Sequence, residues 1–124
     1  MNQVVAIGVG GALGSVARFG LSTWVYALLG RNFPYGTFVV NVLGCLMMGI
    51  LFVLFTERIT DSSVLRAGVL IGVLGGFTTF SSFSIETFNL MEQDETTKAG
   101  LYILGSVLLC VASTWLGVLI GRQL

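Results

Sequence analysis

Four long apolar runs, separated by short hydrophilic stretches, limit the possible folds of this sequence more than any other feature. The runs cover approximately residues 4–30, 35–55, 65–90 and 99–120. Each has the ~20 residues that a helix needs to cross about 30 Å of hydrocarbon. Because the runs are continuous and do not alternate between polar and apolar residues, they exclude the strands of a β-barrel. The sequence therefore predicts an all-α membrane protein, with residues 1–124 forming a single transmembrane domain of four helices.

The shortage of charge excludes several classes of protein. Only six basic and six acidic residues occur among 124, and 55% of the residues are apolar, so a water-facing surface cannot be assembled. The two signs balance, which leaves no electrostatic footprint for nucleic acid. Histidine is absent, and with it the most common general base and metal ligand. No nucleophile–base pair can be placed, so we expect that the chain is not an enzyme.

The basic residues are too evenly divided to fix one orientation in the membrane. An even number of spans puts both termini on one side, with Arg58, Arg66 and Arg122, whereas Arg31 and Lys98 lie on the other. The positive-inside rule depends on the difference between the two sides, and three against two is nearly no difference. We therefore expect the chain to insert in both orientations.

Glycine is unusually frequent, with 17 residues in 124. Small residues four apart let helix backbones approach closely in lipid. Three series have this spacing: Gly10 and Gly14; Gly68, Gly72 and Gly76; Gly117 and Gly121. For each pair, packing within one chain is about as good an explanation as a subunit interface. Because so many pairs occur on four helices, we expect a homodimer, which dual insertion would make antiparallel.

The third run carries the strongest functional signal, at residues 75–84, Gly-Gly-Phe-Thr-Thr-Phe-Ser-Ser-Phe-Ser. Adjacent glycines and repeated Ser and Thr weaken a helix, so we expect the third helix to be broken at mid-membrane. Broken backbone at that depth is tolerated only in protein or beside a cavity, and freed carbonyls can coordinate Na⁺ or K⁺. Phe80 and Phe83 share a face, and their positively polarised ring edges, with nearby hydroxyls, suit a small anion.

Polar residues also recur in the second and fourth runs. Asn41, with Thr37 one turn before it, offers neutral N–H donors for an anion, although a hydrogen bond between helices explains it equally well. In the fourth run a series at four-residue spacing consists of Tyr102, Ser106, Cys110 and Thr114. The series extends over ~18 Å of helix, and its hydroxyls favour a polar track along a pathway. Cys110 is only a weak donor and interrupts this track.

A few other side chains are unusual inside an apolar run. Arg18 lies deep enough in the first run to need a water-filled vestibule or a partner. Glu86 lies nearer to the end of the third run, and both a surface charge and a pathway residue agree with its position. Cys45 and Cys110 are two isolated thiols, which predict neither a disulfide framework nor a metal site.

Residues 75–84 closely resemble the signature of the CrcB or Fluc family of fluoride channels. Two further segments agree with this family: Gly-Gly-Ala-Leu-Gly at residues 10–14, followed by Arg18, and Gly-Thr-Phe-Val-Val-Asn-Val-Leu-Gly at residues 36–44. The similarity covers the whole chain. The resemblance implies a passive, fluoride-selective channel in the inner membrane of a bacterial cell. Such a channel exports F⁻ from the cytoplasm and protects the cell against fluoride toxicity.

The resemblance also implies partners and site residues. Two chains would form an antiparallel homodimer with two pores. Phe80 and Phe83 would turn their ring edges to the fluoride ion, and Asn41 would donate to it. The other pathway residues would be Thr37, Ser81, Tyr102, Ser106 and Thr114.

Two further roles follow from the same resemblance. Arg18 would lie at the aqueous vestibule of the pathway. The backbone carbonyls of Gly75 and Thr78 would hold a structural Na⁺ on the dimer axis.

Two other classes of function remain open. A small multidrug exporter also has four spans and dual insertion, but such exporters resemble proton-coupled antiporters with a buried carboxylate in the first span. Here the first span contains Arg18 and no acid. A non-conducting membrane assembly subunit predicts that replacing Asn41 or Phe80 leaves function unchanged. Fluoride flux that does not depend on a proton gradient would exclude the exporter.

Overall fold

The computed structural model describes residues 2–59 and 61–124. Within these residues, four helices are long and apolar enough to cross a membrane. The first span is α1 (Gln3–Leu29) and the fourth is α6 (Thr96–Gln123). The second consists of α2 (Tyr35–Val53) and the π-helical η1 (Leu54–Arg58). The third consists of α3 (Ser63–Arg66), the π-helical η2 (Ala67–Leu74), α4 (Gly75–Phe77) and α5 (Phe80–Glu92). The predicted class, all-α with four membrane-spanning helices, is confirmed.

Short polar signals set the helix ends. The side chain of Asn2 accepts a hydrogen bond from the N–H of Val5 at 2.9 Å, which caps the start of α1. Gly30, with φ of 82°, ends the same helix in a conformation that favours glycine. Ser62 caps α3 by accepting from the N–H of Leu65 at 3.1 Å. The residues that border the apolar runs thus supply the helix caps.

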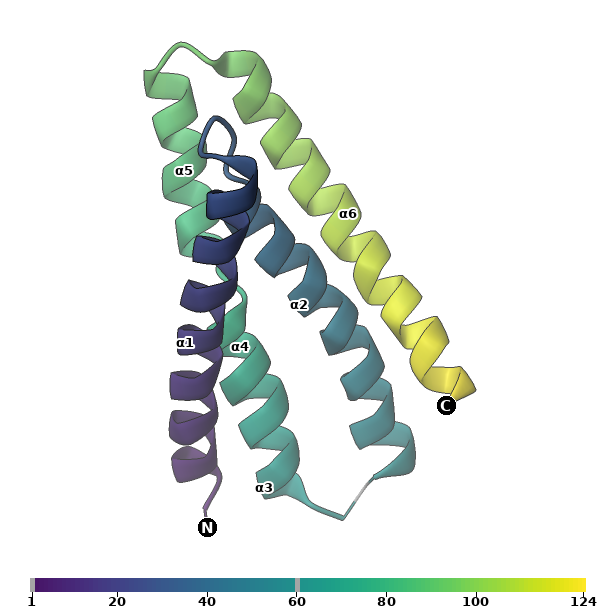
Figure 1. Cartoon of the computed structure of the whole chain (residues 1–124). Coiled ribbons are helices and arrows are strands. Elements are labelled where there is room, and N and C mark those ends of the chain that lie inside the picture. The colour runs from purple at the N-terminus through teal and green to yellow at the C-terminus, as the bar shows by residue number, and fades with distance from the viewer. Residues whose placement is uncertain (1, 60) are drawn as a thin grey trace.

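The helices pack as two pairs. Figure 1 shows α6 lying along α2, and α1 lying along the third span. Both ends of the chain lie toward the same end of the molecule as η1 and α3 (Figure 1). This arrangement is the one expected for an even number of spans.

The glycine series brings helix backbones together inside the chain. A Cβ atom on Gly10 would meet the carbonyl oxygen of Gly68, and one on Gly14 would meet that of Val73, so α1 lies directly against η2. A Cβ on Gly117 would meet a backbone oxygen of α2. The series therefore serves packing within one chain, the alternative left open above. Its spacing gives no support to a second chain.

The third span is interrupted within the 75–84 motif. Thr78, with φ of −83° and ψ of 157°, and Thr79, with φ of −149° and ψ of 121°, are both extended. The helical backbone therefore stops after α4 and starts again at α5. The hydroxyl of Thr79 accepts from the N–H of Ser82 at 3.2 Å and so caps the new start.

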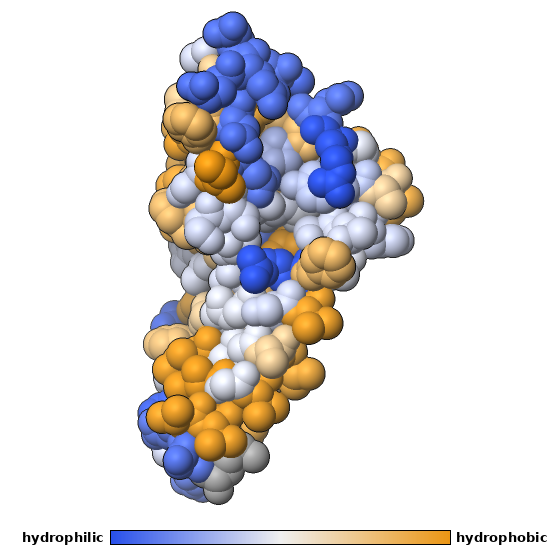
Figure 2. Space-filling view, turned by 90° about the vertical axis from the view of Figure 1, so that its left-hand side faces the viewer, coloured by the Kyte–Doolittle hydropathy of each residue, from blue (hydrophilic) through white to orange (hydrophobic). Residues whose placement is uncertain are grey.

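Large apolar side chains cover much of the outside of the molecule. Val16, Phe19 and Trp115 are 72%, 73% and 69% exposed, respectively. On the face shown in Figure 2, a hydrophobic surface extends over the lower half, with hydrophilic side chains toward the two ends. A surface of this kind suits contact with lipid, so the chain is a multi-pass membrane protein.

Candidate functional site at the interrupted helix

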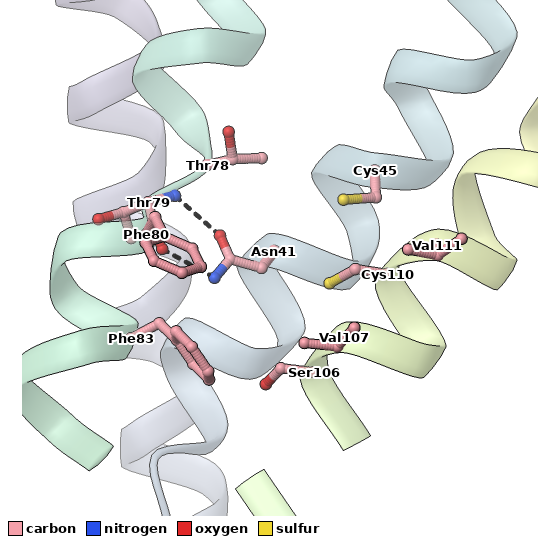
Figure 3. A pocket seen from close by; sticks show the side chains of 10 residues that line it. All are labelled: Asn41, Cys45, Thr78, Thr79, Phe80, Phe83, Ser106, Val107, Cys110 and Val111. Carbon is pink, nitrogen blue, oxygen red and sulfur yellow. Dashed lines mark hydrogen bonds between the residues drawn. The ribbon is translucent and has the colours of Figure 1, made fainter. Parts of the chain in front are cut away.

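Asn41 holds the interruption in place from the neighbouring helix α2. Its Nδ2 donates to the carbonyl oxygen of Thr79 at 2.9 Å, and its Oδ1 accepts from the N–H of Thr79 at 2.8 Å (Figure 3). One amide side chain thus pairs both backbone groups of the residue at the break. This is the hydrogen bond between helices that the sequence offered as one explanation of Asn41. A carboxamide carries two N–H donors, so one of them remains for a ligand.

Two carbonyl groups at the interruption lose the partners that a continuous helix would give them. In an α-helix the N–H of Thr79 would donate to the carbonyl of Gly75, but it donates to Asn41 instead. The N–H of Ser82 would donate to the carbonyl of Thr78, but it caps α5 on the Thr79 hydroxyl. Gly75 and Thr78 are the two residues named from the sequence as cation ligands, and their carbonyls are released from these helical bonds.

A cavity of about 320 Å³ lies beside the interruption, between α2, α5 and α6 (Figure 3). Phe80 and Phe83 both line it, with their ring centroids 5.3 Å apart. Phe80 is 77% exposed, whereas Phe83 is 8% exposed and its ring lies 4.9 Å from that of Tyr102. The two rings therefore face one cavity, but only Phe83 belongs to the core of the chain. The cavity is lined by Asn41, Cys45, Thr78, Thr79, Phe80, Phe83, Ser106, Val107, Cys110 and Val111.

Ser106 lines this cavity and has a buried hydroxyl without a partner in the described chain. The residue is only 7% exposed, and its Oγ has no hydrogen-bond partner among the described residues. Figure 3 shows the hydroxyl directed from α6 toward the side of the cavity that Phe83 occupies. A buried polar group without a partner is unfavourable by about 1–3 kcal/mol. The cavity thus contains a neutral donor that lacks an acceptor.

The other hydroxyls of the series on α6 donate to protein groups. Tyr102 donates to Glu86 Oε2 at 3.4 Å, and Thr114 donates to the carbonyl of Cys45 at 3.2 Å. Neither residue lines the cavity at the interruption. Of the four-residue series, only Ser106 and Cys110 line it.

Glu86 lies at the centre of a group of hydroxyls. Thr37 donates to its Oε1 at 2.6 Å, and Tyr26 and Tyr102 donate to its Oε2 at 3.3 and 3.4 Å. The guanidinium of Arg31 lies 4.4 Å from the ring centroid of Tyr26, and both residues border a cavity of about 190 Å³ that Glu86 also lines. Sequence reasoning missed Tyr26. The available signal was the position of Tyr26 near the end of the first apolar run. This end lies on the same side of the membrane as the end of the third run, where Glu86 is found.

A cavity of about 250 Å³ lies on the α1 side of the interruption and is lined by Arg18, Thr37 and Thr79, among others. Nε of Arg18 is buried and has no hydrogen-bond partner in the described part of the chain. Ser81 is exposed, and its hydroxyl lies 3.3 Å from that of Thr79. Because Thr79 also lines the first cavity, the interruption separates the two spaces.

The two cysteines, which the sequence treats as isolated, lie next to each other. Cys45 on α2 and Cys110 on α6 line the same cavity (Figure 3), and their thiols interact. Both are free. No group of three or more His, Cys, Asp or Glu side chains that could hold a metal ion occurs within residues 2–59 and 61–124.

Four membrane-spanning helices, with a cavity beside the interrupted third span that is lined by aromatic, aliphatic and neutral polar side chains, define a small multi-pass membrane protein. The family model described as CrcB-like protein, Camphor Resistance (CrcB), matches residues 5–118. The chain belongs to this family.

Curated relatives match nearly the whole chain. A protein from Coxiella burnetii (strain Dugway 5J108-111) is 55% identical over 98% of this chain and 99% of its own length. One from Magnetococcus marinus is 52% identical over 97% and 98%, and one from Geobacter metallireducens is 48% identical over the full length of both. All three are named fluoride-specific ion channel FluC. The resemblance found in the sequence is confirmed, and these relatives are channels rather than enzymes.

Proposed function

We propose that this chain forms a passive, fluoride-selective ion channel that exports F⁻ from the cytoplasm and protects against fluoride toxicity. Membership of the CrcB family and the names of relatives that are 48–55% identical support this function. The structural observation that carries it is the buried hydroxyl of Ser106, which has no partner among the described residues and lies beside Phe83. A small anion is the acceptor that such a donor needs.

Neutral donors explain how the cavity can bind fluoride and still release it. The free N–H of Asn41, the hydroxyl of Ser106 and the ring edges of Phe80 and Phe83 replace part of the water around the ion. None of these groups carries a charge, so the ion is held weakly enough to leave. Conduction requires exit as well as entry.

The surrounding polar groups extend the pathway on both sides of the interruption. Arg18 borders the α1-side cavity, where an unpaired guanidinium nitrogen attracts anions to the vestibule. Ser81 lies next to Thr79, which lines both cavities. The remaining pathway residues, Thr37, Tyr102 and Thr114, hold the hydroxyl network of Glu86 and the contact between α2 and α6.

The proposed assembly is an antiparallel homodimer with two pores in the bacterial inner membrane. Phe80 lines the cavity yet is 77% exposed in the single chain, so a second chain packed against this face would close the cavity. Gly75, at the start of the interrupted segment, is exposed as well. The balance of basic residues between the two sides agrees with chains of opposite orientation.

A structural Na⁺ fits the carbonyls of Gly75 and Thr78, because both lose their helical partners at the interruption. Oxygen atoms are the ligands that hard cations prefer. A cation bound there would supply positive charge that offsets part of the energetic cost of placing an anion in a low dielectric. Replacing Na⁺ with a large organic cation throughout should weaken dimer assembly or F⁻ efflux. Unchanged assembly and efflux would show that these carbonyls hold no cation.

Ser106→Ala tests the proposed function. Because the hydroxyl has no partner in the described chain, its loss should not lower the free energy of unfolding and should raise it by up to about 1–3 kcal/mol. Efflux of F⁻ from liposomes should fall about tenfold, since a hydrogen bond to an ion is worth ~1.5–3 kcal/mol.

Ser113→Ala is the matched control, because it removes a hydroxyl from the same helix but outside the cavity lining. It should leave F⁻ efflux unchanged. Full efflux by Ser106→Ala would mean that fluoride does not pass this hydroxyl.

A further inference from the structure

Cys45 and Cys110 occupy equivalent places on two closely packed helices. Cys45 follows Asn41 by one turn on α2, and Cys110 follows Ser106 by one turn on α6. The helices are in backbone contact near this level, because a Cβ atom on Gly49 of α2 would meet a carbonyl oxygen of α6. The two cysteines therefore lie on facing helices that are in backbone contact one turn away from Cys45.

The pair differs from two unrelated cysteines in three respects. Both side chains line the cavity of about 320 Å³, at the end away from Phe83 (Figure 3). The two side chains lie side by side, one on α2 and one on α6 (Figure 3). They are the only two cysteines in the sequence, and both are free.

We propose that Cys45 and Cys110 form a two-coordinate binding site for a soft, thiophilic metal cation, for which Hg²⁺ is the probe. Thiolates select soft cations. Two S–H bonds break and two S–Hg bonds form, the two protons go to solvent, and no oxidant is required. The product is neutral, because two thiolates balance one divalent cation. Val107 and Val111, which line the same cavity, are compatible with a neutral complex but not with an isolated charge.

A cation at this site would lie in the cavity with Ser106 and Phe83 and would bridge α2 to α6. Binding of the metal depends only on the two thiols. Its consequence, a block of fluoride movement through the cavity, rests on the proposed function.

The binding experiment uses the purified protein with mercuric chloride, followed by a monothiol that removes singly bound metal. Retained mercury is then measured by elemental mass spectrometry. The wild-type chain should retain one Hg²⁺, because two thiolates hold it together. Cys45→Ser and Cys110→Ser should each retain at least tenfold less, because a single thiolate exchanges its metal with the monothiol. Equal retention by either variant would overturn the site.

A double variant, Cys45→Ser with Ser63→Cys, provides the matched control. It restores two thiols per chain but places one on α3, a different helix, outside the cavity lining. It should lose Hg²⁺ to the monothiol as the single variants do, and retention would show that thiol number rather than position matters. Helical circular dichroism and size-exclusion elution of each variant, compared with the wild type, establish that loss of metal is not loss of fold.

The efflux experiment measures fluoride movement with and without Hg²⁺, each variant compared with its own untreated rate. Wild-type efflux should fall at least tenfold and recover when a dithiol removes the metal. Fluoride efflux by Cys45→Ser should be the same with and without Hg²⁺ once the monothiol has removed singly bound metal. Retained Hg²⁺ with undiminished efflux would overturn the block and show that fluoride does not use this cavity, while the binding result would still stand.

Discussion

Asn41 replaces, with a single side chain, the backbone hydrogen bonds that the third span loses at its interruption. Its amide pairs both the N–H and the carbonyl of Thr79 at 2.8 and 2.9 Å. Buried backbone groups without partners are rare, because each costs about as much as a lost hydrogen bond. The break in the helix and the amide opposite it therefore form one unit, in which the amide keeps an extended backbone stable beside a cavity.

Asn41→Ala should destabilise the folded chain by about 2–3 kcal/mol, because both backbone groups of Thr79 lose their partner. Thermal or denaturant unfolding in detergent, followed by circular dichroism, measures this change. Asn89→Ala, on the exposed surface of α5, is the control and should change stability by less than ~0.5 kcal/mol. If Asn41→Ala is no less stable than the control, the amide does not hold the interruption.

Phe80→Ile should leave the fold of the chain intact and reduce F⁻ efflux about tenfold, which corresponds to ~1.4 kcal/mol. The side chain is 77% exposed, so its packing within the chain is slight, but it lines the cavity. Efflux from liposomes into fluoride-free buffer, followed with a fluoride electrode, measures the effect. Phe88→Ile on the same helix is 51% exposed and outside the cavity lining, and it should conduct normally. Undiminished efflux by Phe80→Ile would remove the ring from the mechanism.

Individual residues could be predicted from the sequence only where their chemistry is unusual for a membrane interior. Asn41 and Ser106 stood out as polar groups in apolar runs, and the structure places both at one cavity. The roles of Tyr102 and Thr37 as donors to Glu86 could not be predicted, because they depend on the packing of three different helices. The contact between Cys45 and Cys110 depends on the same kind of packing and was missed for the same reason.

At the scale of the elements, α1 and η2 are in direct backbone contact at positions that are occupied by glycine. The space beside Gly14 is already filled by the backbone of Val73, whereas the space beside Gly20 on the same helix is open within 4 Å. Close approach of backbones replaces the hydrophobic driving force that is missing between helices in lipid. The packing of the first span against the third thus depends on glycine, which has no side chain, at the contact positions.

Gly14→Ala should destabilise the fold by about 1–3 kcal/mol, because the new methyl group would meet the backbone of η2. Gly20→Ala adds the same methyl to open space and should stabilise α1 by up to ~1 kcal/mol, the helix-propensity difference between the two residues. Unfolding of the two variants in the same detergent tests the contrast. Equal stability of the two variants would contradict the packing of α1 against η2.

The elements themselves were predictable in part. Hydrophobic runs and charged stretches located the four spans to within a few residues of the observed helices. The interruption near Thr78 followed from glycines and hydroxyls that weaken a helix. The π-helical turns of η1 and η2 were not predicted. The five residues of η1 are too few to show a hydrophobic period, and η2 is apolar throughout and therefore shows none.

At the scale of the whole molecule, the distribution of charge is as informative as the fold. The two basic residues on one side nearly balance the three on the other, so the chain carries almost no signal for one orientation. Both chain ends lie toward the same end of the bundle (Figure 1), so inverting the chain moves both ends to the other side of a membrane. Such a chain can supply both halves of an antiparallel pair.

A topology reporter fused to the C-terminus should be found on both sides of the membrane, because three basic residues against two give no strong bias. Changing Glu92 and Gln93 to Lys adds positive charge to the side that holds Arg31 and Lys98. This double variant should shift the reporter toward the orientation that keeps that side in the cytoplasm. A single-sided reporter in the wild type would contradict dual insertion.

The most direct test of the account is the efflux of F⁻ and Cl⁻ from liposomes that contain the purified wild-type protein, with no proton gradient. Neutral donors in a cavity of about 320 Å³ predict rapid loss of F⁻ and retention of Cl⁻, with a rate that an imposed proton gradient leaves unchanged. Equal loss of the two anions would contradict selectivity. Fluoride loss that requires a proton gradient would contradict a passive channel and would favour a coupled exporter.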